Sequence, residues 1–399
     1  MHGIVALALA CTGPDADDAA PTVPPTVSDT APRAVTYTDR TDDLPVLTGF
    51  CMDAAPVDVD GDDDLDLVLA QEFRENVLLI NDGTGRFTDA SDRLPRTRRD
   101  SEDITIGDFD GIDGPDILIV SEDDRTNELY LNDGTGGFVD ASDQIPVDGV
   151  SNGVVSLALD DDGRPDVVIG NAGANAALLG GLPLVEAPRR IPDTPSTTQD
   201  LEVGDVDGDG DLDLVIANEG ANVLWRNDGN GSFAAEPAAI ALREVPEESR
   251  EAELGDVDGD GDLDLVFGNI QFIVGDADRA NRLLLNDGTG RFTEVAGFPG
   301  GDDDTFDVEL LDLDDDGDLD LVTANLDSLS GNPADRPYRV YANDGDGGFS
   351  LATQGFFPPT AVGNGFDIEG ADFTGDGRLD LYLCSRGGQD RLLVGADAP

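Results

Sequence analysis

The chain has 399 residues, of which 39% are hydrophobic and 49 are glycine. Its 86 acidic residues outnumber 23 basic ones, all arginine, and the formal net charge is -63. Such a field repels phosphate groups, which disfavours a nucleic-acid partner, and we expect none. The single histidine is His2, in a predicted leader, so catalysis by a serine–histidine, cysteine–histidine or zinc–histidine group is excluded from the mature chain.

The first residues predict export. Residues 1–11 form an apolar run that ends in small residues before Cys11. Ala8-Leu9-Ala10-Cys11 resembles a bacterial lipobox, which implies lipidation of Cys11, although the run lacks basic residues. A plain secretory leader with an incidental cysteine is the alternative. We expect an outer-membrane or cell-surface lipoprotein, or a secreted protein, with membrane contact only through a lipid anchor.

Residues 12–34 are mainly Thr, Pro, Asp and Ala with few large apolar side chains. A segment of this composition cannot bury enough surface to fold, so we predict a disordered tether.

One stretch organises the remainder of the chain. Asp205-Val-Asp-Gly-Asp-Gly-Asp-Leu-Asp213 precedes an apolar run, and Asp256–Asp264 repeats it almost letter for letter. Carboxylates at positions 1, 3, 5 and 9 converge if the backbone coils tightly, which glycines at positions 4 and 6 permit. Position 7 would contribute a carbonyl. Oxygen ligands in a flexible loop favour calcium over magnesium. The following β-branched run predicts a strand where an EF-hand would have a helix.

Seven units carry this loop, at intervals of 47 to 60 residues; the loops start at Asp58, Asp108, Ala158, Asp205, Asp256, Asp312 and Asp372. In each unit a strand enters the loop, an apolar strand leaves it, and a third strand ends in a tight turn before a fourth. Asn-Asp-Gly between apolar runs is a strong hairpin signal. The pattern predicts an all-β fold, a seven-bladed β-propeller with four antiparallel strands per blade over residues 35–399.

The two ends of this region predict ring closure. The last unit stops after its third strand, at Arg391–Pro399. Tyr37–Pro45 matches the fourth-strand pattern of Phe87–Pro95. We therefore expect residues 35–45 to supply the closing strand of blade seven, which removes an exposed edge.

At this point residues 35–399 resemble the FG-GAP/VCBS repeat family, whose members are similar to the propeller of integrin α-chains. The D-x-D-x-D-G-x-x-D loops carry the resemblance. It implies calcium in the loops between first and second strands, and a role in binding or adhesion at the cell surface.

The loops differ in how completely they keep the pattern. About four strong calcium sites are expected, with ligands Asp58, Asp60, Asp62, Asp66; Asp205, Asp207, Asp209, Asp211, Asp213; Asp256, Asp258, Asp260, Asp262, Asp264; and Asp312, Asp314, Asp316, Asp318, Asp320. Up to three weaker sites each lack one carboxylate, with ligands Asp108, Asp110, Asp116; Asp160, Asp162, Asp166; and Asp372, Asp376, Asp380. Solvated acidic turns are the alternative, but closely packed like charges repel without a cation.

An acid stands five residues before loop position 1 in six units, namely Asp53, Asp103, Asp200, Glu251, Asp307 and Asp367. If first strands line the axis, these acids surround one mouth of a channel. They could capture a cation or a basic ligand, but bonding to nearby backbone is the favoured interpretation.

Cys51 and Cys384 lie at the entry to the first strand of blade one and at the exit from the second strand of blade seven. Those blades are neighbours if the ring closes, so a disulfide could clamp the seam. Two buried free thiols are an equal alternative.

For function, we expect a monomeric, non-enzymatic propeller that binds protein or glycan. The long connections Asn269–Arg282 and Asn325–Arg339 follow second strands and mark the binding face. The alternatives are a secreted carbohydrate-active lyase or esterase using the axial face, and a purely structural surface component.

Overall fold

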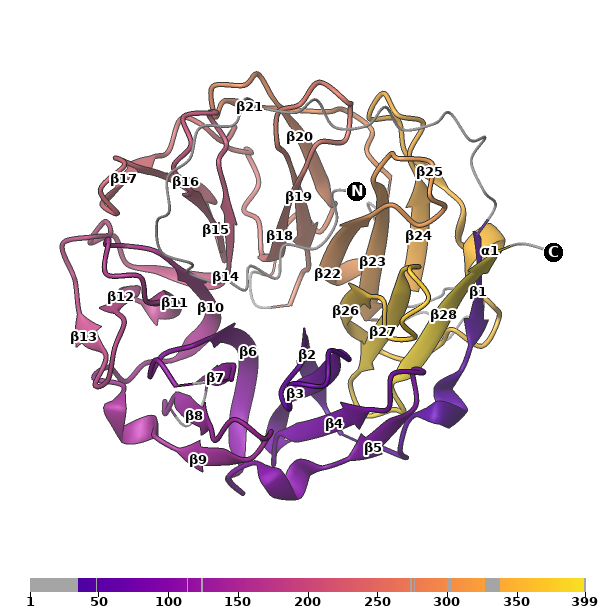
Figure 1. Cartoon of the computed structure of the whole chain (residues 1–399). Coiled ribbons are helices and arrows are strands. Elements are labelled where there is room, and N and C mark those ends of the chain that lie inside the picture. The colour runs from indigo at the N-terminus through magenta and orange to yellow at the C-terminus, as the bar shows by residue number, and fades with distance from the viewer. Residues whose placement is uncertain are drawn as a thin grey trace, which may run out of the picture.

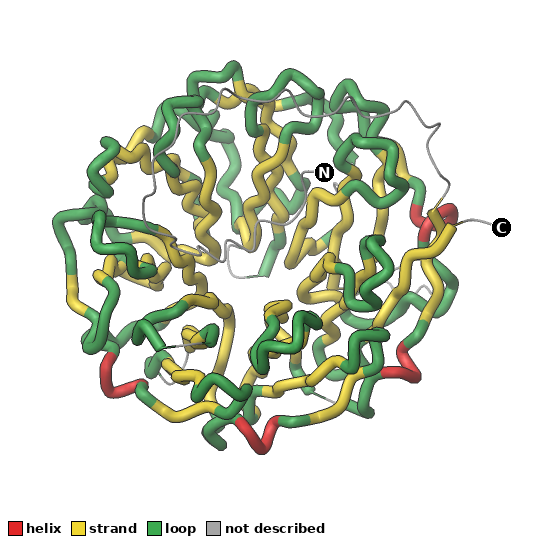
Figure 2. The backbone as a smooth tube through the Cα atoms, viewed as in Figure 1, coloured by secondary structure: helices red, strands yellow, loops and turns green. Residues whose placement is uncertain are grey.

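The computed structural model describes residues 35–397, except 48, 113, 123–124, 273–274, 276, 300–302 and 327–337. The predicted leader, Cys11 and the predicted tether lie outside the described residues. The described chain is all-β, and its helices are single turns at the periphery (Figure 2). They are η1 (Thr41–Asp43), η2 (Ser91–Arg93), η3 (Ser142–Gln144) and α1 (Thr353–Phe356).

The strands form successive antiparallel groups of four, arranged in a ring with the first strand of each group innermost (Figure 1). The innermost strands are β2 (Cys51–Val57), β6 (Arg99–Gly107), β10 (Ser151–Leu157), β14 (Ser196–Gly204), β18 (Ser249–Gly255), β22 (Asp304–Leu311) and β26 (Gly365–Ala371). The second strands are β3 (Asp66–Arg74), β7 (Asp116–Ser121), β11 (Asp166–Gly173), β15 (Asp213–Asn218), β19 (Asp264–Asn269), β23 (Asp320–Leu326) and β27 (Asp380–Ser385).

The third and fourth strands lie progressively farther from the centre (Figure 1). The third strands are β4 (Val77–Asn81), β8 (Glu128–Asn132), β12 (Ala176–Leu179), β16 (Val223–Asn227), β20 (Arg282–Asn286), β24 (Tyr338–Ala342) and β28 (Arg391–Asp397). The outermost strands are β5 (Phe87–Asp89), β9 (Phe138–Asp140), β13 (Val185–Glu186), β17 (Phe233–Glu236), β21 (Phe292–Glu294), β25 (Ser350–Leu351) and β1 (Val35–Asp39). Short pairings of β3 with β6 and of β11 with β14 join two adjacent pairs of groups into eight-stranded sheets.

The second strands are apolar at successive positions because both of their faces are buried. Leu67 of β3 packs in a cluster with Tyr382 of β27, whereas Val68 faces the other way and packs with Ile117 of β7. The hydrophobic core is therefore divided into clusters between neighbouring groups. Each fully buried aliphatic side chain contributes about 1.5–3 kcal/mol, so these interfaces hold the ring together.

The N-terminal strand closes the ring. β1 pairs antiparallel with β28, from Val35 opposite Asp397 to Asp39 opposite Leu393. Tyr37 is only 5% exposed and lies in a hydrophobic cluster with residues of β27 and β28. The first described strand thus completes the sheet of the last three, as the sequence predicted, although the strand covers only residues 35–39 of the expected 35–45.

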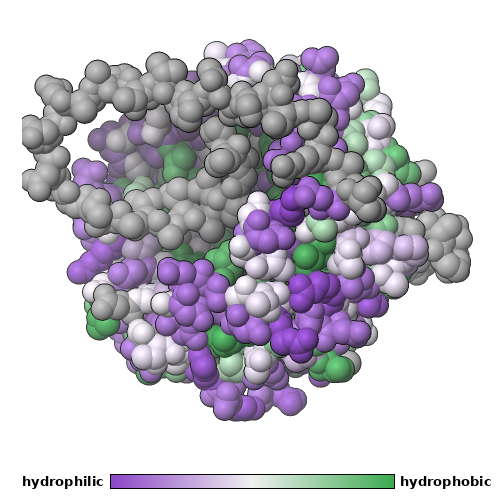
Figure 3. Space-filling view, turned by 45° about the vertical axis from the view of Figure 1, so that its right-hand side comes forward, coloured by the Kyte–Doolittle hydropathy of each residue, from purple (hydrophilic) through white to green (hydrophobic). Residues whose placement is uncertain are grey.

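The surface seen in Figure 3 is mostly hydrophilic, with hydrophobic side chains in small separate patches. This agrees with the large excess of acidic over basic residues.

Candidate metal-binding loops and axial channel

The acidic loops connect first to second strands, and their backbone coils as the sequence predicted. In the four complete loops the coil has left-handed residues at positions 4 and 6, for example Gly208 (φ 71°) and Gly210 (φ 93°). Asp63 (φ 70°) at position 6 of the first loop and Asp315 (φ 60°) at position 4 of the sixth adopt the same conformation. Aspartate tolerates this region better than most side chains, so the coil forms there without glycine.

The position 1 carboxylate organises each complete loop. In the first loop, Asp58 accepts hydrogen bonds from the backbone N–H groups of Gly61 at 2.7 Å and Asp63 at 3.0 Å. Asp205, Asp256, Asp312 and Asp372 accept equivalent bonds. The loop therefore wraps around its first aspartate.

Position 3 has a carboxylate oxygen that no hydrogen-bond donor reaches. In the four loops predicted to bind calcium strongly, the Oδ1 atom of this residue is buried and has no protein partner; the residues are Asp60, Asp207, Asp258 and Asp314. The seventh loop has Thr374 here, and its Oγ1 atom is likewise buried and without a partner. A cation would compensate such oxygens.

The loop acids also lie close enough to share an ion. Oxygens of Asp58, Asp60 and Asp62 lie within 4.8 Å of one another, as do those of Asp205, Asp207 and Asp209. The second loop brings together Asp108, Asp110 and Asp116 in the same way. The donors are hard oxygens in a flexible loop, so the residues present fit calcium.

Position 9 has a structural role that the sequence analysis missed. Asp66 is fully buried, and its carboxylate accepts bonds from the backbone N–H groups of Asn81 at 2.8 Å and Val59 at 3.2 Å. The other position 9 residues accept the same bond from the third strand of their group or from the residue directly after it; they are Asp116, Asp166, Asp213, Asp264, Asp320 and Asp380. Burial, with a smaller contribution from nearby acids, raises the pKa of Asp66 to about 7. This residue therefore anchors the loop to the third strand, in addition to the ligand role that its spacing predicts.

The Asn of the Asn-Asp-Gly turn links neighbouring groups, which the sequence analysis also missed. Asn286 Nδ2 donates to the carbonyl of Leu263 in its own loop, at 3.0 Å, and to that of Val206 in the preceding loop, at 2.8 Å. Asn81, Asn132 and Asn343 make equivalent bonds to the preceding loop. Each such asparagine joins two acidic loops around the ring.

Cys51 and Cys384 form a disulfide, with Cα atoms 5.4 Å apart. It joins β2 to β27, and both cysteines are fully buried. The disulfide lies at the same seam that β1 closes.

The acids five residues before the loops lie on the first strands and line an axial cavity of about 170 Å³. Asp103 accepts a 2.6 Å hydrogen bond from the backbone N–H of Val154, and Asp200 accepts one of 3.0 Å from Ala252. The favoured interpretation, bonding to backbone, is therefore right for these two, although the donors belong to the next group of strands. Burial raises the pKa of Asp200 to about 6.

Together, the fold and the loops define a propeller-like, all-β repeat protein with an acidic loop in each repeat. A family model described as FG-GAP-like repeat matches residues 58–111, 159–216, 205–267 and 325–383, more than half of the chain. The chain belongs to the FG-GAP-like repeat family.

Two relatives are forms of cartilage acidic protein 1. The Mus musculus protein is 30% identical over 190 residues, which are 46% of this chain and 28% of that protein. The Homo sapiens protein is 28% identical over 193 residues, covering 46% and 27%. The aligned region thus spans less than a third of the length of the curated relatives that it matches.

Two solved structures share the fold. A chain in the crystal structure of BBS1N in complex with ARL6DN aligns with a TM-score of 0.56 at 12% identity, over 92% of this chain and 98% of that one. The extracellular domain of the two component system BT3049 from B. thetaiotaomicron aligns with a TM-score of 0.52 at 13% identity, over 92% and 42%.

Proposed function

We propose that the chain is a calcium-stabilised, seven-bladed propeller that acts outside the cell as a binding module and not as an enzyme. Each antiparallel group of four strands is one blade, and each complete acidic loop holds one calcium ion. The weaker loops, which start at Asp108, Ala158 and Asp372, hold calcium less tightly because each lacks one carboxylate.

The observation that carries the calcium proposal is the buried, unpartnered oxygen at position 3 of the four complete loops. Leaving a polar atom buried without a partner costs about 1–3 kcal/mol, and more for a charged group. The other Asp60 oxygen receives only a long contact, 3.4 Å from Arg93. A calcium ion between positions 1, 3 and 5 would offset the repulsion among these carboxylates and complete their coordination.

Two observations support a role outside the cell. The disulfide fits an oxidising compartment. One structural neighbour is itself described as an extracellular domain. Among the described residues no helix has the length and apolar character needed to cross a membrane. We propose an exported chain, anchored by lipid at Cys11 or secreted.

The proposed ligand is a protein or glycan, and the proposed binding face carries the connections after the second strands. The connection from β19 to β20 presents Phe272, which is 49% exposed and contacts the ring of Phe306, with centroids 5.8 Å apart. Most of the connection from β23 to β24 lies outside the described residues. Long connections on a rigid scaffold are common sites of recognition.

Calcium dependence is tested by melting the full chain in calcium and in EGTA. One site at a hundred times its dissociation constant adds about 2.7 kcal/mol, so four sites should raise the melting temperature by about 10 °C or more. Asp258→Asn should remove part of this increment, whereas the exposed Asp92→Asn outside the loops should not. An unchanged melt in EGTA, with no calcium in the untreated protein by elemental analysis, would overturn the proposal.

The binding role is tested on glycan and protein arrays, each probed with and without calcium. We expect the chain to bind an arrayed glycan or protein in calcium and to lose that binding in EGTA. Cleavage of an arrayed glycan would instead assign the chain to the enzymes, and an array without any bound component would favour a structural role.

A further inference from the structure

The innermost strands direct two successive side chains toward the axis where a regular strand would direct one. In β2, β14, β18, β22 and β26 the register shifts by one residue just before the ring acid, so two successive side chains face the centre. Phe366 and Asp367 of β26 therefore both line the axial cavity, as do Met52 and Asp53 of β2. Glu369 lies two residues farther along β26 and lines it as well.

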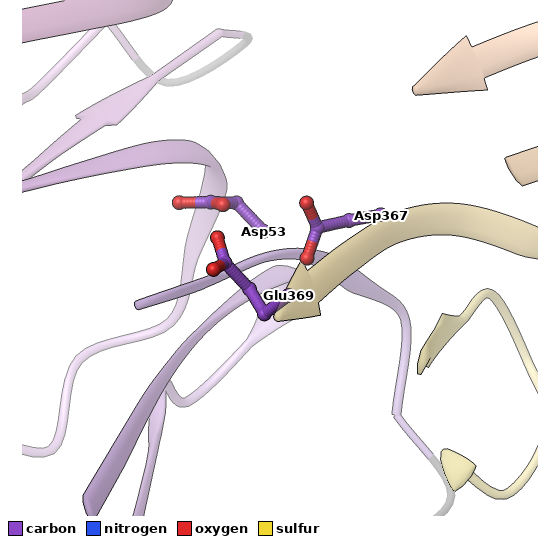
Figure 4. Close-up of side chains that lie close together, drawn as sticks. All are labelled: Asp53, Asp367 and Glu369. Carbon is purple, nitrogen blue, oxygen red and sulfur yellow. The ribbon is translucent and has the colours of Figure 1, made fainter. Parts of the chain in front are cut away.

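Three of these acids converge. Oxygens of Asp53, Asp367 and Glu369 lie within 4.8 Å of one another. Figure 4 shows the three carboxylates gathered in one space, from β2 on one side and β26 on the other.

A second observation at this place is independent of the cluster itself. Asp307 of β22 lines the same cavity, is only 6% exposed, and its Oδ2 atom has no hydrogen-bond partner. Asp367 is 9% exposed, and its Oδ2 atom also has no partner. On β6 and β14, by contrast, Asp103 and Asp200 use their Oδ2 atoms to accept backbone N–H groups. Among the described residues that line the cavity, the buried side-chain oxygens without a partner belong to Asp307 and Asp367, on β22 and β26.

The positive charge that lines the cavity contacts residues other than these acids. Of the residues described as lining it, Arg250 is the one basic side chain. Its guanidinium donates to Gln199 and lies over the Phe306 ring, 5.6 Å from the centroid. Burial raises the pKa of Asp367 well above its ordinary value, and repulsion by Asp53 and Asp307 raises it further. Four carboxyl groups thus share a confined space without a compensating cation from the protein.

We propose that Asp53, Asp307, Asp367 and Glu369 hold a divalent cation in the axial channel, separate from the ions of the acidic loops. Oxygens on opposite sides of a calcium ion lie about 4.6–5.2 Å apart, which accommodates the separations among Asp53, Asp367 and Glu369. Two of its ligands come from β26 and the others from β2 and β22, so the ion joins the first and the last two groups of strands. Its remaining coordination positions face the cavity.

The test counts the calcium ions retained by the full chain after gel filtration, by elemental analysis. Asp367→Asn/Glu369→Gln should lose one ion per chain. Glu202→Gln, on β14 two residues beyond the cavity-lining Asp200, is the matched control and should lose none. Asp258→Asn reports on a loop site, and combining it with the axial pair should lose two ions. If the loops bind no calcium, only the axial variant changes the count, which separates this inference from the proposed function.

A second measurement guards against a variant that merely folds poorly. Crystals of the wild-type chain soaked in Mn²⁺ should give an anomalous difference peak among Asp53, Asp367 and Glu369. In EGTA the axial variant, Asp367→Asn/Glu369→Gln, should melt at a higher temperature than the wild type, because it removes repulsion between carboxylates. Calcium should raise its melting temperature by less than it raises that of the wild type. Wild-type calcium content in the axial variant, or peaks at the loops with none on the axis, would overturn the inference.

Discussion

Reducing the Cys51–Cys384 disulfide should lower the stability of the chain mainly by increasing the conformational entropy of the unfolded state. The two cysteines are 333 residues apart in sequence. Chain entropy for a closed loop of this length corresponds to about 5–6 kcal/mol at 25 °C, as an upper value. Both residues are fully buried and the sheet of β1 and β28 closes the same seam, so native contacts should change little on reduction. This is a large part of the 5–15 kcal/mol that typically separates folded from unfolded chains.

The assay is urea unfolding of the Cys11→Ser chain, followed by far-UV circular dichroism, with and without dithiothreitol. With an m-value of about 3 kcal/mol per molar urea, the midpoint should fall by nearly 2 M on reduction. Cys51→Ala/Cys384→Ala should unfold close to the reduced chain, with about 1–2 kcal/mol of further loss from packing. Equal midpoints for the oxidised and reduced chains would refute the reasoning. So would two reactive thiols in denatured, unreduced protein.

Three further predictions concern the strand closure, the asparagine links and the channel. Deleting residues 1–45 should cost about 5–9 kcal/mol through the loss of three buried side chains, Val35, Tyr37 and Leu44, whereas deleting 1–33 should cost nothing; equal melting temperatures would contradict the closure. Asn286→Ala should destabilise by about 1 kcal/mol more than Asn227→Ala in thermal melts, because among the bonds described for Asn227 none reaches a neighbouring loop. Burial raises the pKa of Glu202 to about 8. The folded chain therefore keeps a proton on Glu202 that the unfolded chain releases near pH 4.5. Because of this difference, the stability of the wild type should fall as the pH rises from about 4.5 to about 8. In EGTA, Glu202→Gln should therefore gain about 1–3 kcal/mol over wild type at pH 9 and nothing at pH 4, and a gain independent of pH would argue against this titration.

Local sequence signals were sufficient for the repeated four-strand pattern. The Asn-Asp-Gly turns and the spaced aspartates act within a few residues, and they recur at a regular interval. The closing strand was also predictable, because Tyr37–Pro45 repeats the motif of Phe87–Pro95 while the last unit lacks it.

The features that the sequence did not reveal depend on distances across the ring. The sequence indicated only a turn role for Asn286. Its bond to the carbonyl of Val206 joins residues that are 80 positions apart, and no local pattern indicates such a contact. The register shift before Asp367 interrupts the alternation of side chains between the two faces of β26. The sequence of the strand does not indicate this shift. The pairing of the two cysteines stayed open because it depends on a Cα separation that only the closed ring determines.

The closing strand has a consequence for synthesis on the ribosome. β1 emerges among the first described residues, yet its partner β28 runs to Asp397. Until translation is nearly complete, the β1 segment therefore has no pairing partner, while the groups of strands between β1 and β28 can fold as they are synthesised. A product cut short before residue 391 would release β1 and leave β27 as an open edge, a template for pairing with other chains. Completion of the nascent chain is thus the event that covers the edge of β27.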